Sequence, residues 1–205
     1  MNNKRIGIYG GTFSPPHLGH RRAVEAFALA EQLDEIYVIP TFTPPHKQLQ
    51  GDATPQQRME MCRLAFAGLP ITVSDLEIRR GGKSYTVLTL EELKAPDNTL
   101  VLLCGTDMFL TIDSWYQAAR IFELAEIVYV QRETGLLGVE SAAKLAKKRV
   151  ELQEKYHAVA RPLPCDTMMI SSSTLRAMLE KGENTDAYVD SAVRGYIDQW
   201  KLYRA

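Results

Sequence analysis

RIGIYGGTFSPPHLGHRRAVEAFALAEQL, residues 5–33, runs from a short apolar segment through two glycines and two prolines into a longer stretch with helical spacing. The apolar residues of 5–10 are continuous rather than alternating, which is typical of a strand buried on both faces of a parallel sheet. In residues 17–33 the apolar side chains recur on one helix face. The stretch therefore predicts a β-strand, a glycine turn and an α-helix.

The same alternation continues along the chain. Later apolar runs predict strands at 35–40, 71–78, 99–105 and 126–132. Residues 54–69 predict a helix with Thr54 as N-cap and proline at its first position. Alternating strands and helices favour a doubly wound α/β fold with a parallel, Rossmann-like sheet.

The pattern changes after residue 132. It predicts a charged helix over 138–155, whose basic run 144–149 is a solvated face, a short strand at 157–162, and helices over 174–181 and 186–198. We expect one domain over 1–205, with residues 170–205 as a helical part packed on the sheet, because 205 residues with 45% apolar side chains suffice for one sizeable core.

The bulk composition excludes several classes of partner. The 24 Lys and Arg residues nearly balance the 25 Asp and Glu residues, so no overall field favours a nucleic acid or a membrane surface. Three widely spaced cysteines, without a C-x-x-C pair, are typical of reduced thiols and disfavour zinc ribbons and disulfide frameworks. No segment is typical of a signal peptide or a membrane span. We predict a cytoplasmic location and leave a homo-oligomer open.

The glycine turn after the first strand is the usual phosphate site of such a sheet. Gly10 and Gly11 allow backbone N–H groups to approach an anion, and a helix that starts near His17 points its N-terminus at the same place. His17 and His20 share a helix face and can donate to one ligand. Three interpretations remain open from these residues alone: exposed histidines beside a structural turn, a nucleotide site, and a metal site, which lacks a third ligand nearby.

Two other glycine patterns do not define a nucleotide site. The first turn lacks the G-x-G-x-x-G spacing of dinucleotide-binding proteins. The segment GGKS at 81–84 ends like a P-loop, but Glu77 stands where that motif needs its first glycine.

Two motifs together resemble the nucleotidyltransferase superfamily. GTFSPPHLGH at 11–20 resembles its G-x-F-x-P-x-H-x-G-H motif, with His17 and His20 as the two histidines. ISSSTLR at 170–176 resembles its I-S-S-[ST]-x-[IL]-R signature and ends in Arg176.

Further segments resemble, within that superfamily, the nicotinate-mononucleotide adenylyltransferase family of bacterial NAD synthesis. They are PTFTPPHK at 40–47, TPQQRMEM at 54–61, SYTVLTL at 84–90, GTD at 105–107 and SWY at 114–116. Leu88 departs from the family, which usually has Asp in S-Y-T-x-D-T-L. The absence of a carboxylate at this position is compatible with a different substrate or with a less active enzyme.

The resemblance implies transfer of an adenylyl group from ATP to nicotinate mononucleotide, which gives nicotinate adenine dinucleotide and pyrophosphate, with Mg²⁺ carried mainly by ATP and no metal site built by the protein alone. It implies that His17, His20 and Arg176 are catalytic. It implies ATP contacts at Gly10, Gly11, Thr12, Phe13, His17, His20, Gly105, Asp107, Ile170, Ser171, Ser172, Ser173 and Arg176. It implies nicotinate mononucleotide contacts at Thr12, His46, Lys47, Tyr85, Thr86, Trp115, Tyr116 and Arg132.

Several of these residues also have a plainer interpretation. Ser171 to Ser173 and Arg176 fit an ordinary helix cap with a solvated arginine, and a tryptophan such as Trp115 is most often a core residue. The alternatives for function are an adenylyltransferase that takes nicotinamide mononucleotide or another small phosphate, and a non-catalytic nucleotide-binding relative.

Overall fold

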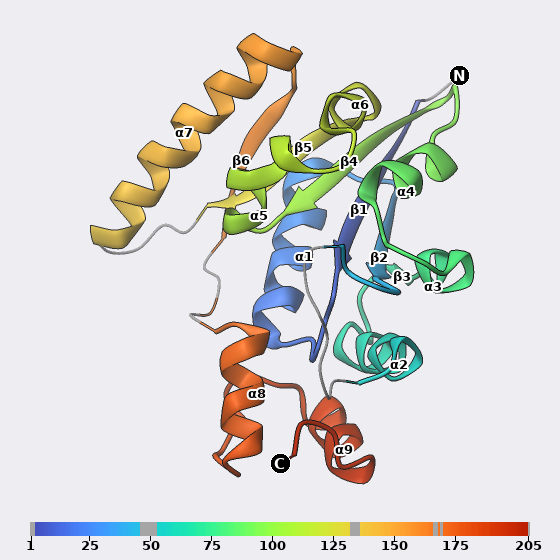
Figure 1. The fold of residues 1–205 in the computed structure, drawn as a ribbon, viewed down its shortest axis with the longest axis vertical. Coiled ribbons are helices and arrows are strands. Elements are labelled where there is room, and N and C mark those ends of the chain that lie inside the picture. The colour runs from blue at the N-terminus through green and yellow to red at the C-terminus, as the bar shows by residue number, and fades with distance from the viewer. Residues whose placement is uncertain (1–2, 46–52, 132–135, 166–167, 169, 205) are drawn as a thin grey trace.

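A computed structural model of the chain describes residues 3–45, 53–131, 136–165, 168 and 170–204, without the side chains of 136–140. Six parallel strands in these residues form one sheet with the order β3-β2-β1-β4-β5-β6 (Figure 1). The strands are β1 (Lys4–Gly11), β2 (Glu35–Pro40), β3 (Thr72–Val73), β4 (Asn98–Cys104), β5 (Ala125–Gln131) and β6 (Ala160–Pro164). Strand order reverses between β1 and β4, which confirms the predicted doubly wound fold.

Helices connect these strands, and the last two helices follow β6. They are α1 (Leu18–Glu31), α2 (Pro55–Ala65), α3 (Leu76–Arg80), α4 (Thr86–Leu93), α5 (Thr106–Thr111), the 3-10 helix η1 (Ile112–Ser114), α6 (Ala118–Leu124), α7 (Leu136–Tyr156), α8 (Ser172–Glu180) and α9 (Ser191–Gln199). As predicted, α2 begins after Thr54, whose side chain accepts a hydrogen bond from the Gln57 N–H. None of the helices in the described part is long and apolar enough to cross a membrane.

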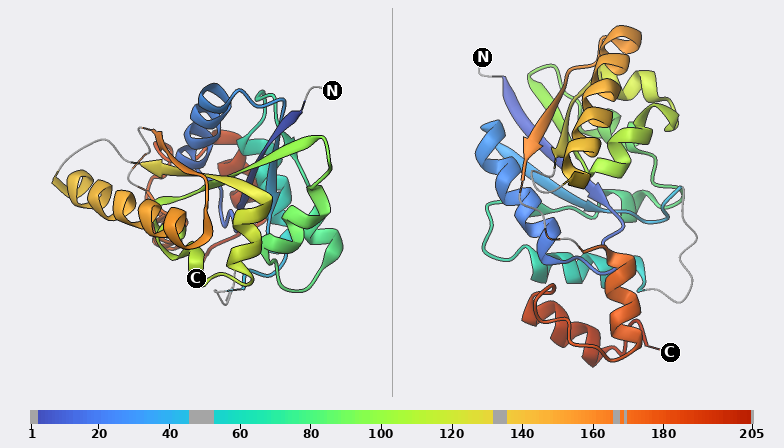
Figure 2. Two further views of the ribbon diagram at one scale, coloured as in Figure 1. Left: turned by 90° about the horizontal axis from the view of Figure 1, so that it is seen from above. Right: turned by 90° about the vertical axis from the view of Figure 1, so that its left-hand side faces the viewer.

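The sheet lies between two helical layers (Figure 2). On one face, Phe27 of α1 and Met61 of α2 pack with strand residues such as Val101 into one buried cluster. On the other face, α4, α5, α6 and α7 contribute side chains such as Leu90 and Leu145 to a second cluster. Burial on both faces explains why the strands have continuous apolar sequences.

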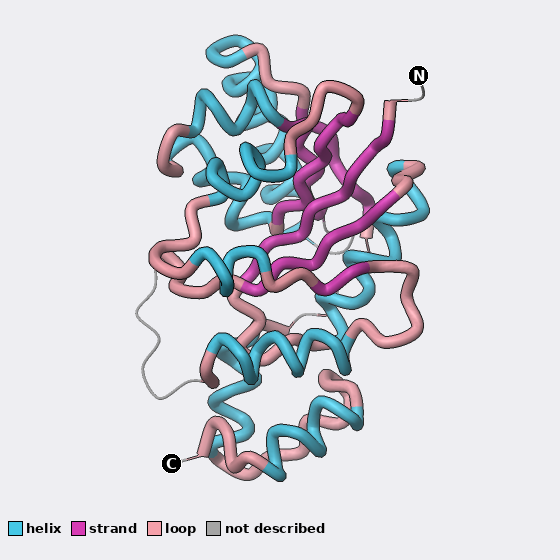
Figure 3. Tube along the Cα trace, turned by 90° about the vertical axis from the view of Figure 1, so that its right-hand side faces the viewer, coloured by secondary structure: helices cyan, strands magenta, loops and turns pink. Residues whose placement is uncertain are grey.

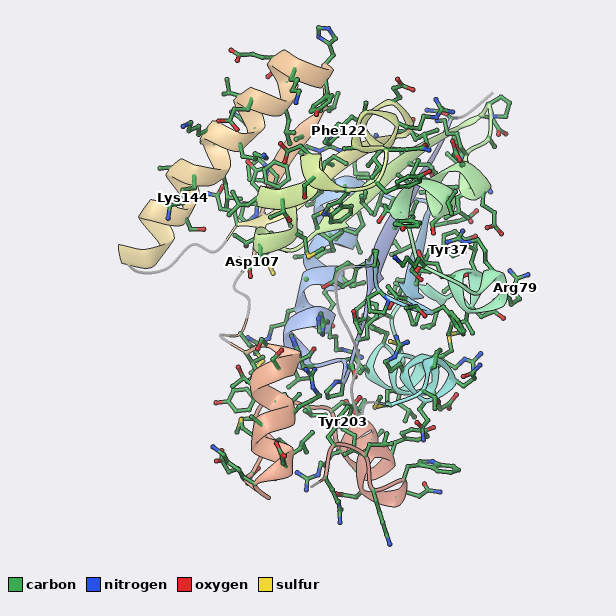
Figure 4. All side chains as sticks on the ribbon, in the orientation of Figure 1. Tyr37, Arg79, Asp107, Phe122, Lys144 and Tyr203 are labelled. Atoms are coloured by element: carbon green, nitrogen blue, oxygen red, sulfur yellow. The ribbon has the colours of Figure 1, made fainter. Side chains whose placement is uncertain are left out.

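The C-terminal helices α8 and α9 lie beyond one end of the sheet (Figure 3). Leu175 of α8 and Val193 of α9 belong to the same buried cluster as Phe27 and Met61. The hydroxyl of Tyr203, which follows α9 (Figure 4), lies 3.0 Å from the hydroxyl of Ser14 in the loop after β1. A hydrogen bond therefore joins the segment after α9 to the loop after β1.

The strand predicted over 71–78 is wrong beyond its first residues. β3 has only two residues, and α3 takes up the second half of the segment. The Ser74 hydroxyl accepts a hydrogen bond from the Leu76 N–H at 3.3 Å, and the Asp75 carboxylate pairs with Arg79 at 2.9 Å. These local side-chain bonds replace a sheet ladder and start a helical turn.

Three predictions in the C-terminal part of the chain also need correction. The strand expected at 157–162 is β6, three residues later, and its two prolines are tolerated because the sheet ends there. The basic run at 144–149 is not solvated throughout: Lys144 is exposed (Figure 4), whereas Lys148 is largely buried and pairs with Asp113 at 2.5 Å. The last helix begins at Ser191, because the Asp190 carboxylate caps it.

Candidate active site

A cavity of about 590 Å³ opens at the carboxyl ends of β1 and β4, where the strand order reverses. This is the usual ligand position in an open parallel sheet. The sequence-predicted residues that line it are Gly10, Gly11, Thr12, Phe13, His17, His20, Tyr85, Thr86, Gly105, Trp115, Tyr116, Ile170, Ser171, Ser172, Ser173 and Arg176. They come from segments up to 166 positions apart in the sequence.

Of the four other predicted residues, the structure describes Asp107, which does not line the cavity. Asp107 is exposed on the first turn of α5, between two lining residues, and Figure 4 places it on the side of α5 toward α8. His46, Lys47 and Arg132 lie outside the described residues. The roles of these four residues stay predictions.

His17 and His20 cap the start of α1 reciprocally. His17 is the N-cap, and its Nδ1 accepts a hydrogen bond from the His20 N–H at 3.3 Å. His20 is the third helical residue, and its Nδ1 accepts from the His17 N–H at 3.1 Å. This is the geometry of a capping box, built here from two imidazoles rather than from a hydroxyl and a carboxylate.

The capping bonds fix how the two imidazoles can meet a ligand. Because each Nδ1 accepts a backbone N–H, each neutral ring carries its proton on Nε2 and donates from there. Burial lowers the pKa of His17 to about 4, and burial together with the nearby His17 holds the pKa of His20 well below its usual value. The rings stack with centroids 3.6 Å apart. Near neutral pH the pair is therefore two uncharged N–H donors.

Gly19 makes room for this arrangement. A Cβ atom at that position would lie 3.0 Å from the Nδ1 of His17, closer than side chains normally pack. Gly10 is different, because a Cβ there would meet no atom within 4 Å and would extend into open space. The absence of a side chain at Gly19 therefore preserves the position of the His17 ring, and its absence at Gly10 leaves space over the end of β1.

Phe13 and Arg58 support the loop between Gly11 and α1. Phe13 has a left-handed backbone with φ of 48°, and its ring meets the His20 ring edge-on at 5.1 Å. Arg58 of α2 is 0% exposed, and it donates to the backbone oxygens of Thr12 and Thr41, both at 2.7 Å, and of Phe42 at 3.0 Å. Arg58 therefore joins the loops that follow β1 and β2.

Sequence reasoning missed Arg58, although a signal exists. Arg58 occupies the same helix face as Met61, Cys62 and Ala65, which are all buried. A charged residue on the apolar face of an amphipathic helix has to find polar partners inside the protein.

The start of α8 lines the cavity next to the loop that leads from β1 to α1. The Ser171 hydroxyl caps the helix by accepting from the Thr174 N–H at 3.0 Å. Ser172 donates to the Pro15 oxygen at 2.9 Å, and the Arg176 Nη1 donates to the Ser14 oxygen at 2.7 Å. These bonds hold the second motif against the first, with Arg176 beside the helix N-terminus, a combination suited to anions.

A third part of the wall carries aromatic rings. The rings of Tyr85 and Tyr116 lie with centroids 4.6 Å apart, and Trp115 packs against the buried cluster under α4 and α6 while it also faces the cavity. The site and core interpretations of Trp115 are thus compatible. Thr86 is the first residue of α4, and no described side chain caps that helix.

Leu88, the departure from the family pattern, is 37% exposed on the first turn of α4 and is not a lining residue. Glu77, Ser84 and Thr89 do line the cavity. Ser84 and Thr89 belong to the segment SYTVLTL at 84–90, whereas the sequence gives no sign of Glu77. Among the described residues, no group of three or more His, Cys, Asp or Glu side chains gathers as a metal site.

Comparisons with known proteins agree with this geometry. A profile of the "Cytidylyltransferase-like" family matches residues 8–178. A "Probable nicotinate-nucleotide adenylyltransferase" of Desulfatibacillum aliphaticivorans is 43% identical over 97% of this chain and 99% of its own length, and one of Citrifermentans bemidjiense is 38% identical over 97% and 98%.

Solved structures share the fold. The Plasmodium falciparum nicotinic acid mononucleotide adenylyltransferase complexed with NaAD superimposes with a TM-score of 0.75 at 20% identity, covering 98% of this chain and 97% of its own. At that identity the likeness concerns the fold, whereas the sequence relatives above determine the family. The chain belongs to the cytidylyltransferase-like family and, within it, to the nicotinate-nucleotide adenylyltransferases.

Proposed function

We propose that this enzyme joins ATP and nicotinate mononucleotide to form nicotinate adenine dinucleotide and pyrophosphate. A phosphate oxygen of the mononucleotide attacks the α-phosphorus of ATP, the bond from that phosphorus to the β-phosphate oxygen breaks, and pyrophosphate leaves. No covalent bond to the protein forms. The observation that carries the proposal is that two helix starts, at α1 and α8, line one cavity. A helix start is suited to an anion.

The two helix starts suit different phosphates of the triphosphate. His17 and His20 donate from Nε2 to the α-phosphate oxygens, where negative charge shifts as the bonds change. The residues Ser171 to Ser173 and Arg176 bind the β- and γ-phosphates and hold the leaving pyrophosphate. The protein thus contributes orientation and electrostatic stabilisation, which are the main requirements of phosphoryl transfer.

Mg²⁺ fits this site as an ion bound to the nucleotide. Of the described lining residues only Glu77 has a carboxylate, and it is buried against Thr89, so the phosphate oxygens and water would supply the ligands. The ion neutralises charge on the triphosphate when bound.

The wall formed by Thr86, Trp115 and Tyr116 receives the pyridine ring. Trp115 and Tyr116 offer aromatic faces for stacking. The N-terminus of α4 faces the same space without a side-chain cap, and its N–H groups favour a carboxylate over a carboxamide, whose NH₂ cannot accept their bonds. We therefore propose that the acid form of the mononucleotide is preferred.

The proposal includes a cytoplasmic location, because Cys62, Cys104 and Cys165 are all free thiols. The test of function is release of pyrophosphate from ATP and Mg²⁺ with nicotinate mononucleotide, nicotinamide mononucleotide or phosphopantetheine as acceptor. We expect release with the first and much less with the others. Equal or greater release with another acceptor would contradict the assignment, and ATP binding without release would favour a non-catalytic protein.

A further inference from the structure

Glu77 is a buried carboxylate that the proposed reaction does not use. It is the second residue of α3, is 5% exposed, and lines the same cavity as Thr86. Its Oε1 accepts a hydrogen bond from the Thr89 hydroxyl at 2.6 Å. In the described part of the chain, its Oε2 and the Nε of Arg80 are the buried side-chain atoms without a hydrogen-bond partner. A carboxylate in this position needs an explanation, because burial opposes its charge.

The bonds around Glu77 tie α3 to α4. Arg80 Nη2 donates to the Thr89 hydroxyl at 2.8 Å and lies 3.8 Å from the Glu77 carboxylate. Thr89 therefore accepts from Arg80 and donates to Glu77, and it is itself 2% exposed. Arg80 also reaches Glu92 at 3.2 Å on the solvent side of α4. The hydroxyl of Thr89 is thus held from two directions by α3.

A second set of bonds extends from this cluster to the loop after β2. The Ser84 hydroxyl accepts from the Phe42 N–H at 2.8 Å, and the Ser84 N–H donates to the Thr43 oxygen at 2.9 Å. Burial raises the pKa of Glu77, while the hydroxyls of Thr89 and Ser84 stabilise its charged form. Three segments of the cavity wall, namely the loop after β2, α3 and the start of α4, therefore meet at Glu77.

We infer that Glu77 is a positioning residue for the acceptor substrate, because it holds the first turn of α4 at the cavity wall through Thr89. Thr86 lies three residues before Thr89 and so shares its helix face. A shift of this turn displaces Thr86 and the uncapped N–H groups of α4, which receive the pyridine carboxylate in the proposed function on which this inference rests. His17 and Arg176 belong to other elements and keep their positions. The effect is therefore confined to the acceptor.

The test compares Glu77→Ala, Glu77→Gln and the control Glu92→Gln. Glu92 also forms an ion pair with Arg80, but its side chain is 48% exposed and it does not line the cavity. We expect Glu77→Ala to raise KM for nicotinate mononucleotide about tenfold, the loss that corresponds to about 1.4 kcal/mol, with little change in kcat or in KM for ATP. Glu77→Gln keeps an oxygen for Thr89 and should recover most of that loss. Glu92→Gln should stay within about twofold of the wild type, as is usual for exposed ion pairs.

Unchanged KM for the mononucleotide in Glu77→Ala would overturn the inference, and so would an equal rise in both KM values, which would indicate general loosening of the site. If the wild type itself makes no dinucleotide, the proposed function fails instead. Should Glu77→Ala not fold, Thr89→Val removes the same hydrogen bond with almost no change of shape, and the same selective rise in KM is expected.

Discussion

The reciprocal cap of α1 allows the structural and chemical roles of His17 to be separated. His17→Asn keeps a side-chain acceptor at the N-cap position, where asparagine is among the preferred residues, and removes the Nε2–H donor. His17→Ala removes both. The matching change at the third helical position is His20→Gln, because glutamine accepts the same backbone N–H in an ordinary capping box.

The two roles have different magnitudes. Loss of one preorganised donor to a transition-state oxygen lowers kcat by about 100- to 1,000-fold. Loss of an N-cap acceptor lowers the free energy of unfolding by about 1 kcal/mol, or about 2–4 °C in Tm for a domain of this length. We therefore expect His17→Asn and His20→Gln to lose turnover with nearly unchanged Tm, and His17→Ala to lose turnover and about 2–4 °C of Tm together.

The assay is pyrophosphate release at saturating ATP and mononucleotide, with Tm measured on the same samples. A His17→Asn variant that keeps kcat within about threefold of the wild type would refute the donor role, since that change is far below the loss of a transition-state bond. A His17→Ala variant as stable as His17→Asn would refute the capping role.

Three further predictions follow from residues of the same wall and cap. Arg176→Gln should lower kcat/KM for ATP by about 10- to 100-fold, because a charged hydrogen bond to phosphate is worth about 1.5–3 kcal/mol, while KM for the mononucleotide measured in the same assay changes little. Leu88→Asp should leave both KM values unchanged and raise Tm slightly, because Leu88 lies off the cavity on the first turn of α4, where a carboxylate meets the positive end of the helix dipole; a changed mononucleotide KM would show that this departure matters. Acid should destabilise the fold through His17, whose folded pKa of about 4 lies below the unfolded value of 6.5, so that the unfolded chain binds more protons as pH falls. Denaturant titrations should show a loss of about 3 kcal/mol from this residue between pH 6.5 and pH 4, and His17→Asn should reduce the slope; an identical slope would count against the lowered pKa.

Local signals account for the elements that sequence analysis placed well. The strand at 5–10 forms because its apolar residues are buried in the sheet, and the helix after it begins with a cap formed by residues three positions apart. Both signals lie in adjacent residues of the sequence. The strand prediction for 71–78 is wrong because the Ile, Thr and Val residues of this segment favour a strand. The Ser74 and Asp75 side chains instead accept hydrogen bonds from nearby residues, and α3 begins there.

The candidate site was only partly predictable, for a different physical reason. The spacing of His17 and His20 on one helix turn is visible in the sequence, and so is the second motif. The bond from Ser172 to the Pro15 oxygen joins residues 157 positions apart, and no periodicity reports such a contact. Glu77 and Arg58 belong to residue types that are mostly exposed, so their burial depends on partners supplied by distant segments.

The buried guanidinium of Arg58 limits how this chain can vary in length. The loops after β1 and β2 have no ladder between them at Thr12 and Phe42, and a single side chain replaces it by binding the backbone of both. A residue inserted on either side would draw acceptors away from a cation that has no access to water, at a cost of several kcal/mol. Relatives should therefore tolerate insertions between α2 and β3 more readily than within the few residues that surround these carbonyls. In an alignment, the loops after β1 and β2 should keep a constant length wherever Arg58 is present.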